Sequence, residues 1–296
     1  MPHLLQLLRQ IILGKDEVLH LSLCCLLAGG HLLLEDPPGM GKTTLAEALA
    51  KVVGLRFRRI QFTSDLMPAD VTGLSVYRQD LQRFEFRPGP LFTQVLLADE
   101  LNRSSPRTQS ALLEAMEEGQ ISQEGRTYRL AKPFWVIATQ NPHTQAGTYV
   151  LPESQMDRFL MRLHLGYPDV RSERALLQGQ DRRQQVRAIT AQTNAEELLN
   201  WQEEVTRVHL SDPLLDYLMR LVLASRTHPD IVQGLSPRGA LALKSAAQAS
   251  AWMAGRDFVT PDDLQRVFPA VVNHRLLSRQ TGQAAALLLT TVPVLP

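Results

Sequence analysis

The chain has 296 residues, with 31 lysine and arginine residues against 30 aspartate and glutamate residues, which gives a formal net charge of +1 at pH 7. This balance excludes a global electrostatic attraction to DNA, RNA or an anionic membrane, although a local basic loop remains compatible with it. The length allows a sizeable hydrophobic core and predicts about two domains.

The first residues indicate the cellular compartment. Met1-Pro2-His3-Leu4 lacks the basic region and the small-residue cleavage site of a secretory signal. Cys24 and Cys25 are adjacent and surrounded by leucines, as is typical of buried thiols in a reducing compartment. Leu19–Leu34 is apolar but too short and interrupted for a membrane span, and predicts a buried helix followed by a buried strand. We therefore expect a cytoplasmic protein without a membrane span.

Short strand-like runs alternate with helical patterns over the first two thirds of the chain, which predicts an α/β fold with a mostly parallel sheet covered by helices on both faces. A helix is expected over Leu45–Val53, and another between a cap at Ser105 and a stop at Gly119. The predicted strands are His31–Glu35, Arg56–Phe62, Gln94–Asp99, Pro133–Thr139 and Met161–Leu165.

Two segments interrupt this alternation and predict β-hairpins. They are Ser75–Phe86, where aromatic and charged residues alternate, and Gln120–Leu130, which contains a Glu124-Gly125 turn. After Tyr167-Pro168 the strand signal vanishes, and helical patterns follow at 194–208, 213–225, 237–254 and 261–275. The chain is therefore expected to divide near residue 168 into an α/β domain, 1–168, and an all-helical domain, 169–296.

The strongest local signal is an apolar run that breaks into a glycine-bearing loop and then opens a helix with Gly41-Lys42-Thr43. Such a loop binds phosphates through its backbone N–H groups, the positive end of the helix and the lysine ammonium, while the threonine hydroxyl is a ligand for Mg²⁺. The strict motif asks for glycine where this chain has Asp36. The expected nucleotide contacts are Asp36, Pro37, Pro38, Gly39, Met40, Gly41, Lys42, Thr43 and Thr44.

Two later strands end in the other groups that NTP hydrolysis needs. Asp99 and Glu100 follow a buried strand, which suits Asp99 to Mg²⁺ and Glu100 to activating the attacking water. Asn141 ends the next buried strand and could orient the γ-phosphate or the water without adding charge. Asn141-Pro142 could also be simply the start of a turn.

The chain resembles the MoxR-type AAA+ ATPases over nearly its whole length. The motifs that carry the resemblance are LLADELNR at 96–103, QSALLEAMEE at 109–118, ATQNP at 138–142 and LPESQMDRF at 151–159, in the family's order. The resemblance implies a P-loop AAA+ core with a five-stranded parallel sheet, a small helical lid, and hairpins inserted in the second helix region, 65–90, and before the sensor strand, 120–130. It also accounts for Asp36, since family members often carry Glu-Asp before this loop.

The resemblance implies roles for residues outside the loop. Arg158 would be an arginine finger that reaches the γ-phosphate on a neighbouring subunit, and an arginine suits this task because it stays charged and donates paired hydrogen bonds. Arg238 would be a second sensor at the start of a lid helix, acting within its own subunit or on the next. Ile12–Lys15 matches the segment that packs on adenine, although a plain turn is an alternative reading.

The implied cofactors are ATP and Mg²⁺. A finger used by the neighbouring subunit implies a ring, with a hexamer expected, because head-to-tail contacts close into rings. The family typically assists the assembly or metal loading of a client protein, often one with a von Willebrand A-type domain.

Three other functions remain open from the sequence. A motor subunit of a metal chelatase would show the same ATPase residues, and a nucleotide-gated scaffold would bind ATP with little turnover. A nucleic-acid translocase is the third, since three arginines and three aromatic residues share the segment 77–87, but Asp80 and Glu85 dilute its charge. We therefore do not expect nucleic acid as a partner, and the histidines show no metal-binding spacing.

Overall fold

The computed structural model describes residues 2–141, 149–178, 182–279 and 284–295. At its centre lies a five-stranded sheet in the order β2-β5-β8-β1-β9, in which every pair of neighbours is parallel. Its strands are β1 (His31–Glu35), β2 (Phe57–Gln61), β5 (Val95–Asp99), β8 (Trp135–Gln140) and β9 (Phe159–Leu163). Because all strands run the same way, their carboxyl ends meet at one edge of the sheet.

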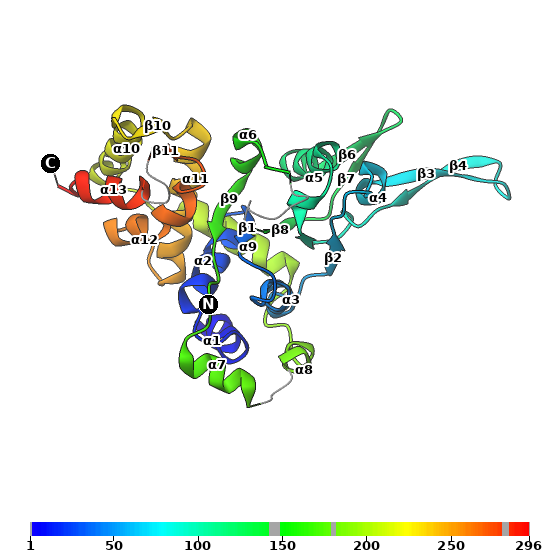
Figure 1. Ribbon diagram of the computed structural model, residues 1–296, viewed down its shortest axis with the longest axis horizontal. Helices are drawn as coiled ribbons and strands as arrows, with labels where there is room; N and C mark the ends of the chain where they lie inside the picture. The colour runs from blue at the N-terminus through cyan, green and yellow to red at the C-terminus, as the bar shows by residue number, and fades with distance from the viewer. Residues whose placement is uncertain (1, 142–148, 179–181, 280–283, 296) are drawn as a thin grey trace.

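Side chains alternate between the two faces of this sheet and build a hydrophobic core on each. Leu32 and Leu34 of β1 join one core, together with α2 (Asp16–Leu27) and α3 (Lys42–Val52). Leu33 joins the other, beneath α5 (Pro106–Glu118). Helices therefore cover both faces (Figure 1), as the alternation of strands and helices predicts.

The last strand of the sheet begins and ends two residues before its predicted position, Met161–Leu165. The apolar pattern does continue to Leu165, but the N–H groups of Leu165 and Gly166 donate to the carboxylate of Asp36 instead of to a neighbouring strand. The polar contact therefore ends the strand where hydrophobicity alone does not.

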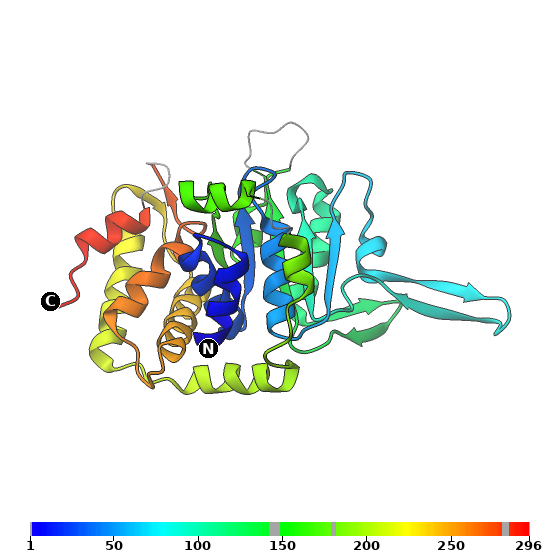
Figure 2. The same ribbon diagram turned by 90° about the horizontal axis from the view of Figure 1, so that it is seen from below.

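Both predicted hairpins are present. β3 (Gly73–Arg78) pairs with β4 (Arg83–Pro88), and the pair projects from the body as an arm (Figures 1 and 2). β6 (Gln120–Gln123) pairs with β7 (Arg126–Arg129) directly after α5. The rings of Phe86 and Tyr128 stack with their centroids 3.9 Å apart, which joins the base of the arm to the shorter hairpin.

Helices occupy the other end of the molecule, beside β9 (Figure 2). The four predicted helices correspond to α9 (Ala195–Arg207), α10 (Asp212–Thr227), α11 (Pro237–Met253) and α12 (Pro261–Val272). The expectation that this part is all-helical was wrong in one detail, because β10 (Ile231–Gln233) and β11 (Leu277–Ser278) form a short antiparallel ribbon. These strands are too short to show a period-two pattern in the sequence.

Short helices complete the described chain: α1 (Pro2–Ile11), α4 (Pro68–Thr72), the 3-10 helix η1 (Leu101–Arg103), α6 (Glu153–Met156), α7 (Val170–Leu177), α8 (Arg182–Arg187) and α13 (Ala284–Thr291). Although α8 follows residue 168, it packs against α3, and Gln192 N–H donates to the carbonyl of Val52 at 2.9 Å. The segment after residue 168 therefore first runs along the α/β part before the helices at the far end begin.

None of the helices in the described ranges combines the length and the apolar character that a bilayer crossing requires.

Candidate functional site

The glycine-bearing loop follows the carboxyl end of β1 and leads into α3. Gly39 and Gly41 both have φ of +86°, a conformation that favours glycine, and Gly41 is the residue immediately before the helix. A Cβ built on either glycine meets no atom within 4 Å, so the space above the loop is open. Backbone N–H groups at the start of the 11-residue helix α3 therefore face a space that can receive an anion.

Lys42 begins α3 and is 8% exposed. Its Nζ donates to the carbonyl oxygens of Asp36 and, at 3.0 Å, Pro37. Burial lowers the pKa of the Lys42 ammonium, and the charges of Asp36, Asp99 and Glu100 partly offset this by raising it. The ammonium thus lies within the field of these three carboxylates, although they come from different segments of the chain.

Asp36 is 4% exposed, and its carboxylate accepts hydrogen bonds from the N–H groups of Leu165 at 2.7 Å and Gly166 at 3.0 Å. The side chain of Asp36, which the sequence predicts to contact the nucleotide, therefore holds the loop to the segment that follows β9. These two hydrogen bonds explain why an aspartate can stand where the strict motif has glycine, since glycine has no side chain to accept them.

Asp99 ends β5 at the same edge of the sheet and is 8% exposed. The hydroxyl of Thr139 donates to its Oδ1 at 2.6 Å, and the guanidinium of Arg59, on β2, donates to its Oδ2 at 2.6 Å. The side chain is thus fixed from both neighbouring strands. Arg59 and Thr139 were not among the residues that we predicted.

Glu100 directly follows β5 and has φ of 57°, a left-handed conformation that costs energy for a residue with a side chain. Its N–H donates to the hydroxyl of Thr139 at 2.8 Å. Its carboxylate accepts hydrogen bonds from Gln61 Nε2 at 3.1 Å and Asn141 Nδ2 at 3.3 Å, and pairs with Arg103 at 3.3 Å. The structure therefore brings Glu100 and Asn141 into direct contact, because β5 and β8 are neighbours in the sheet.

Asn141 is 2% exposed and is held on its backbone side by Asn102. Asn102 Nδ2 donates to the carbonyl of Asn141 at 3.1 Å, and Asn141 N–H donates back to Asn102 Oδ1 at 3.4 Å. This exchange fixes the backbone and leaves the side-chain amide directed at Glu100. Pro142, which completes the ATQNP motif, lies outside the described residues.

A cavity of about 490 Å³ opens beside the loop. It is lined by residues of the loop, by Ile12, Leu13 and Lys15, and by Leu165–Pro168. Lys15 Nζ donates to the carbonyl of Tyr167 at 2.6 Å, which joins two of the lining segments. An apolar cavity next to a phosphate-binding loop has the character of a site for a planar base.

Arg158 and Arg238 lie elsewhere. Arg158 precedes β9, and Phe159 pairs with His31 at the start of β1, whereas the loop follows the end of β1. The five residues of β1 separate these two edges of the sheet by roughly 16 Å. Arg238, in the first turn of α11, meets Arg158 at a shared partner, Glu117.

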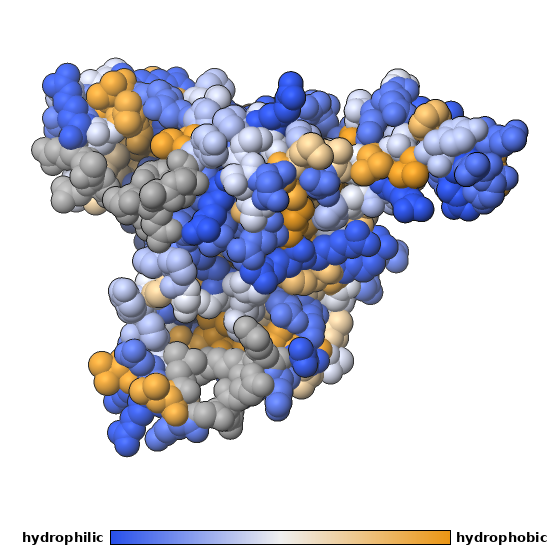
Figure 3. Space-filling view, turned by 45° about the vertical axis from the view of Figure 1, so that its right-hand side comes forward, coloured by the Kyte–Doolittle hydropathy of each residue, from blue (hydrophilic) through white to orange (hydrophobic). Residues whose placement is uncertain are grey.

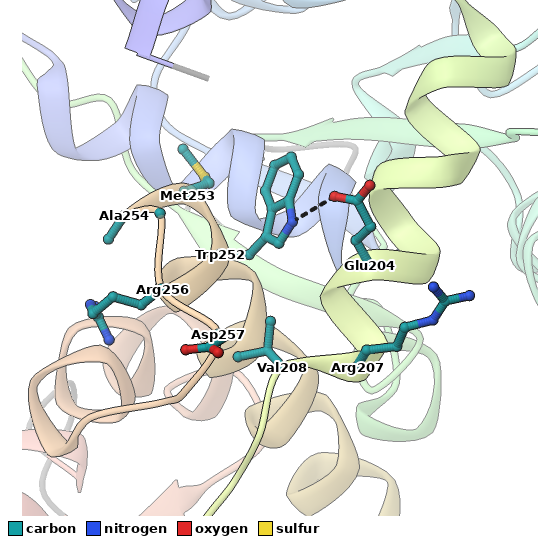
Figure 4. A pocket seen from close by; sticks show the side chains of 9 residues that line it. Glu204, Arg207, Val208, Trp252, Met253, Ala254, Arg256 and Asp257 are labelled. Atoms are coloured by element: carbon teal, nitrogen blue, oxygen red, sulfur yellow. Dashed lines mark hydrogen bonds between the residues drawn. The ribbon is translucent and has the colours of Figure 1, made fainter.

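A further cavity, of about 620 Å³, lies between α9 and the end of α11 (Figure 4). Trp252 Nε1 donates to Glu204 at 3.0 Å along its wall, and Arg207 and Arg256 project at its sides. None of the predicted site residues lines it. The described residues also contain no group of three or more histidine, cysteine, aspartate or glutamate side chains that could hold a metal ion by themselves.

Comparison with known proteins places the chain in a family. Residues 31–161 match the model of the ATPase family associated with various cellular activities (AAA), and residues 223–289 match an AAA lid domain. A crystal structure from Cytophaga hutchinsonii, described as that of a candidate ATPase, superposes with a TM-score of 0.89 at 36% identity over 99% of this chain and 94% of that one.

Sequence relatives agree with this. The chain is 47% identical to the uncharacterized protein YeaC of Bacillus subtilis, over 91% of this chain and 84% of that protein. It is 41% identical to Chaperone MoxR1 of Mycobacterium tuberculosis, over 91% of this chain and 73% of that protein. It is 31% identical to Protein MoxR of Methylorubrum extorquens, over 90% of this chain and 84% of that protein. With the five-stranded parallel sheet, the helical end and these relatives in agreement, the chain belongs to the MoxR-type AAA+ ATPases.

Proposed function

We propose that the protein hydrolyses ATP with Mg²⁺ and uses the reaction to remodel a client protein. The observation that carries the proposal is the meeting of Lys42, Asp99 and Glu100 at one edge of the sheet, beside an open loop at a helix N-terminus. A lysine, a metal-binding carboxylate and a second carboxylate are the groups that phosphoryl transfer to water needs.

The residues fit the nucleotide and the metal. The loop offers backbone N–H groups and the Lys42 ammonium to the phosphates, and the adjacent cavity offers apolar walls to the base. The hydroxyl of Thr43 and the carboxylate of Asp99 are hard oxygen ligands of the kind that Mg²⁺ prefers. Bound Mg²⁺ would neutralise charge on the β- and γ-phosphates. Since Arg59 contacts Asp99 Oδ2, we expect metal binding to displace this guanidinium.

Glu100 would accept a proton from the attacking water. Its carboxylate is oriented by the neutral amide donors of Gln61 and Asn141 and by the ion pair with Arg103 at 3.3 Å. The left-handed backbone at Glu100 is a local cost that a structure retains where a side chain must be aimed in one direction.

We propose that Arg158 completes the site of a neighbouring subunit. Its position at the opposite edge of the sheet keeps it away from the loop of its own chain. A head-to-tail contact between copies would bring it to the neighbour's γ-phosphate and would generate a ring, for which we expect six subunits. Arg238 lies with Arg158, so we assign it to the neighbour's site as well, a choice that the sequence left open.

The projecting arm is the part suited to contact a client. Tyr77 and Phe84 form an edge-to-face pair near its tip and are 52% and 65% exposed. Apolar residues also lie where the arm joins the body (Figure 3). Arg78 is paired with Asp80 and Glu85, which reduces the positive charge available to nucleic acid. A protein client, including one with a von Willebrand A-type domain as the family resemblance implies, suits this surface better.

Glu100→Gln tests the proposal. The variant should bind a fluorescent ATP analogue as the unmodified protein does, while steady-state phosphate release falls by about 10²–10⁴-fold. Glu118, an exposed residue at the end of α5, offers a matched control. Glu118→Gln makes the same change in charge as Glu100→Gln and should leave turnover unchanged. Equal turnover in Glu100→Gln and the unmodified protein would remove the role given to Glu100, and binding without turnover in the unmodified protein would identify a nucleotide-gated scaffold.

A further inference from the structure

Glu117 forms a three-way ionic contact that none of the functions above uses. It lies in the last turn of α5, and its Oε2 is 3.1 Å from a guanidinium nitrogen of Arg158. Its other carboxylate oxygen accepts a hydrogen bond from Arg238. The one carboxylate thus holds together the two arginines that we assign to a neighbour's site.

The charges around Glu117 are unbalanced. A cavity of about 290 Å³ is lined by Glu117, Asp157, Arg158, Arg238 and Arg275, which gives three guanidinium groups against two carboxylates. Asp157 is committed to Arg275, whose Nε donates to it at 2.6 Å. Within this cavity lining Glu117 is therefore the one carboxylate left to pair with Arg158 and Arg238. The excess positive charge favours binding of a second anion there.

Arg238 also sits at an unfavourable place in its helix. It is in the first turn of α11, where the helix dipole disfavours a cation, whereas Glu117 is near the end of α5. A carboxylate beside Arg238 relieves this penalty, and a phosphate would relieve it equally well. The guanidinium is therefore a group that either anion can hold.

The backbone around Arg158 is anchored independently of its side chain. Asp157 accepts a hydrogen bond from Ser236 Oγ at 3.2 Å, and Arg275 donates to the carbonyl of Asp157 at 3.2 Å. The side chain of Arg158 is 29% exposed and that of Arg238 is 47% exposed, so both can change partner without unfolding the segment that carries them.

We propose that Glu117 is the resting partner of Arg158 and Arg238, and that the γ-phosphate of a neighbouring subunit takes both arginines from it when ATP-bound copies assemble. The inference rests on the proposed function. Glu117 is here a positioning residue: it keeps the two guanidinium groups adjacent while it competes with the phosphate for them. Because Glu117 also links α5 to α11, the exchange releases an ionic contact between the α/β part and the lid helix.

Competition between Glu117 and the γ-phosphate for the two arginines predicts the effect of removing the charge of Glu117. Glu117→Gln keeps the shape of the side chain but weakens its hold on the arginines, so association of ATP-bound subunits should tighten by about three- to tenfold. Association in ADP should stay the same, because no γ-phosphate competes. Glu118→Gln is the matched control, since it changes the charge of the next residue, which is exposed and outside the cavity that Arg158 and Arg238 line.

Sedimentation velocity measures this on proteins that also carry Glu100→Gln, so that ATP·Mg²⁺ persists during the run. The expected result is a lower dissociation constant for Glu117→Gln in ATP, no change for Glu118→Gln, and no effect of Glu117→Gln when Arg158→Ala and Arg238→Ala are also present. Equal dissociation constants for Glu117→Gln and Glu118→Gln, weaker association of Glu117→Gln, or tightening that persists without the arginines would overturn the exchange.

The same measurements separate this inference from the function on which it rests. If Arg158→Ala alone does not weaken ATP-dependent association, the assignment of Arg158 to the neighbour's site fails. If Arg158→Ala weakens association but Glu117→Gln behaves like Glu118→Gln, the assignment of Arg158 to the neighbour's site is supported. In that case the proposal that Glu117 competes with the γ-phosphate is wrong.

Discussion

Thr139 donates its hydroxyl proton to Asp99 across 2.6 Å, from one buried strand to the next. The same hydroxyl oxygen accepts the N–H of Glu100 at 2.8 Å. One side chain on β8 thus contacts both acids of the candidate site, which are consecutive residues at the end of β5.

Thr139→Val should therefore disturb the acids without changing the volume of the core. The N–H of Glu100 and one oxygen of Asp99 would lose their partner, which costs about 1–3 kcal/mol in the free energy of unfolding. We expect ATP turnover to fall as well. Urea unfolding and phosphate release measure the two effects, with the exposed Thr127→Val as control. Unchanged turnover in Thr139→Val would contradict the positioning role.

Asp36→Asn should loosen the tie between the loop and the end of β9. The amide keeps one acceptor oxygen but presents N–H groups where the carboxylate accepts from Leu165 and Gly166, so we expect stability to drop by about 1–3 kcal/mol. The KM for ATP should rise, since this tie lies between the loop and the wall of the base cavity. The exposed Asp216→Asn should change neither quantity. If Asp36→Asn is destabilised but its KM for ATP is unchanged, Asp36 contributes to folding and not to nucleotide binding.

Histidine burial predicts how stability depends on pH. Desolvation lowers the pKa of His31 to about 4, while its ordinary value is 6.5. Between these values the unfolded chain binds a proton that the folded chain excludes, so stability is lost as pH falls. For His31 the loss from pH 7 to pH 5 is about 2 kcal/mol.

Urea midpoints at the two pH values test this. His31→Gln should be less stable at pH 7, because Val136 N–H donates to His31 Nδ1 at 3.1 Å, yet it should lose less stability on acidification. The exposed His209→Gln should keep the full pH dependence. The same pH dependence in all three proteins would show that His31 does not carry it.

Local signals explain why much of the site could be predicted. The loop, Lys42 and the Asp99-Glu100 pair lie within single strand-to-loop segments, and parallel strands bring their ends together. Arg59 and Thr139 were missed because their contacts join strands 40 residues apart in the chain. Glu117 was read as part of a motif, but its contact with Arg238 spans 121 residues and depends on how α11 packs.

The fold shows the same division between local and distant causes. Strong alternation located the five central strands and both hairpins within a few residues. The ribbon of β10 and β11 was missed because its strands are three and two residues long. The end of β9 was misplaced because the hydrogen bonds to Asp36, 129 and 130 residues away, decide it.

The central claim is that Arg158 completes the hydrolysis site of a neighbouring subunit, and mixing two inactive variants tests it directly. Glu100→Gln subunits have an impaired site but an intact Arg158, and Arg158→Ala subunits have the reverse. In an equal mixture about a quarter of the head-to-tail contacts would pair an intact site with an intact finger. We predict that phosphate release in the mixture rises to roughly a quarter of the unmodified rate, well above either variant alone. A mixture no more active than its components would contradict the account.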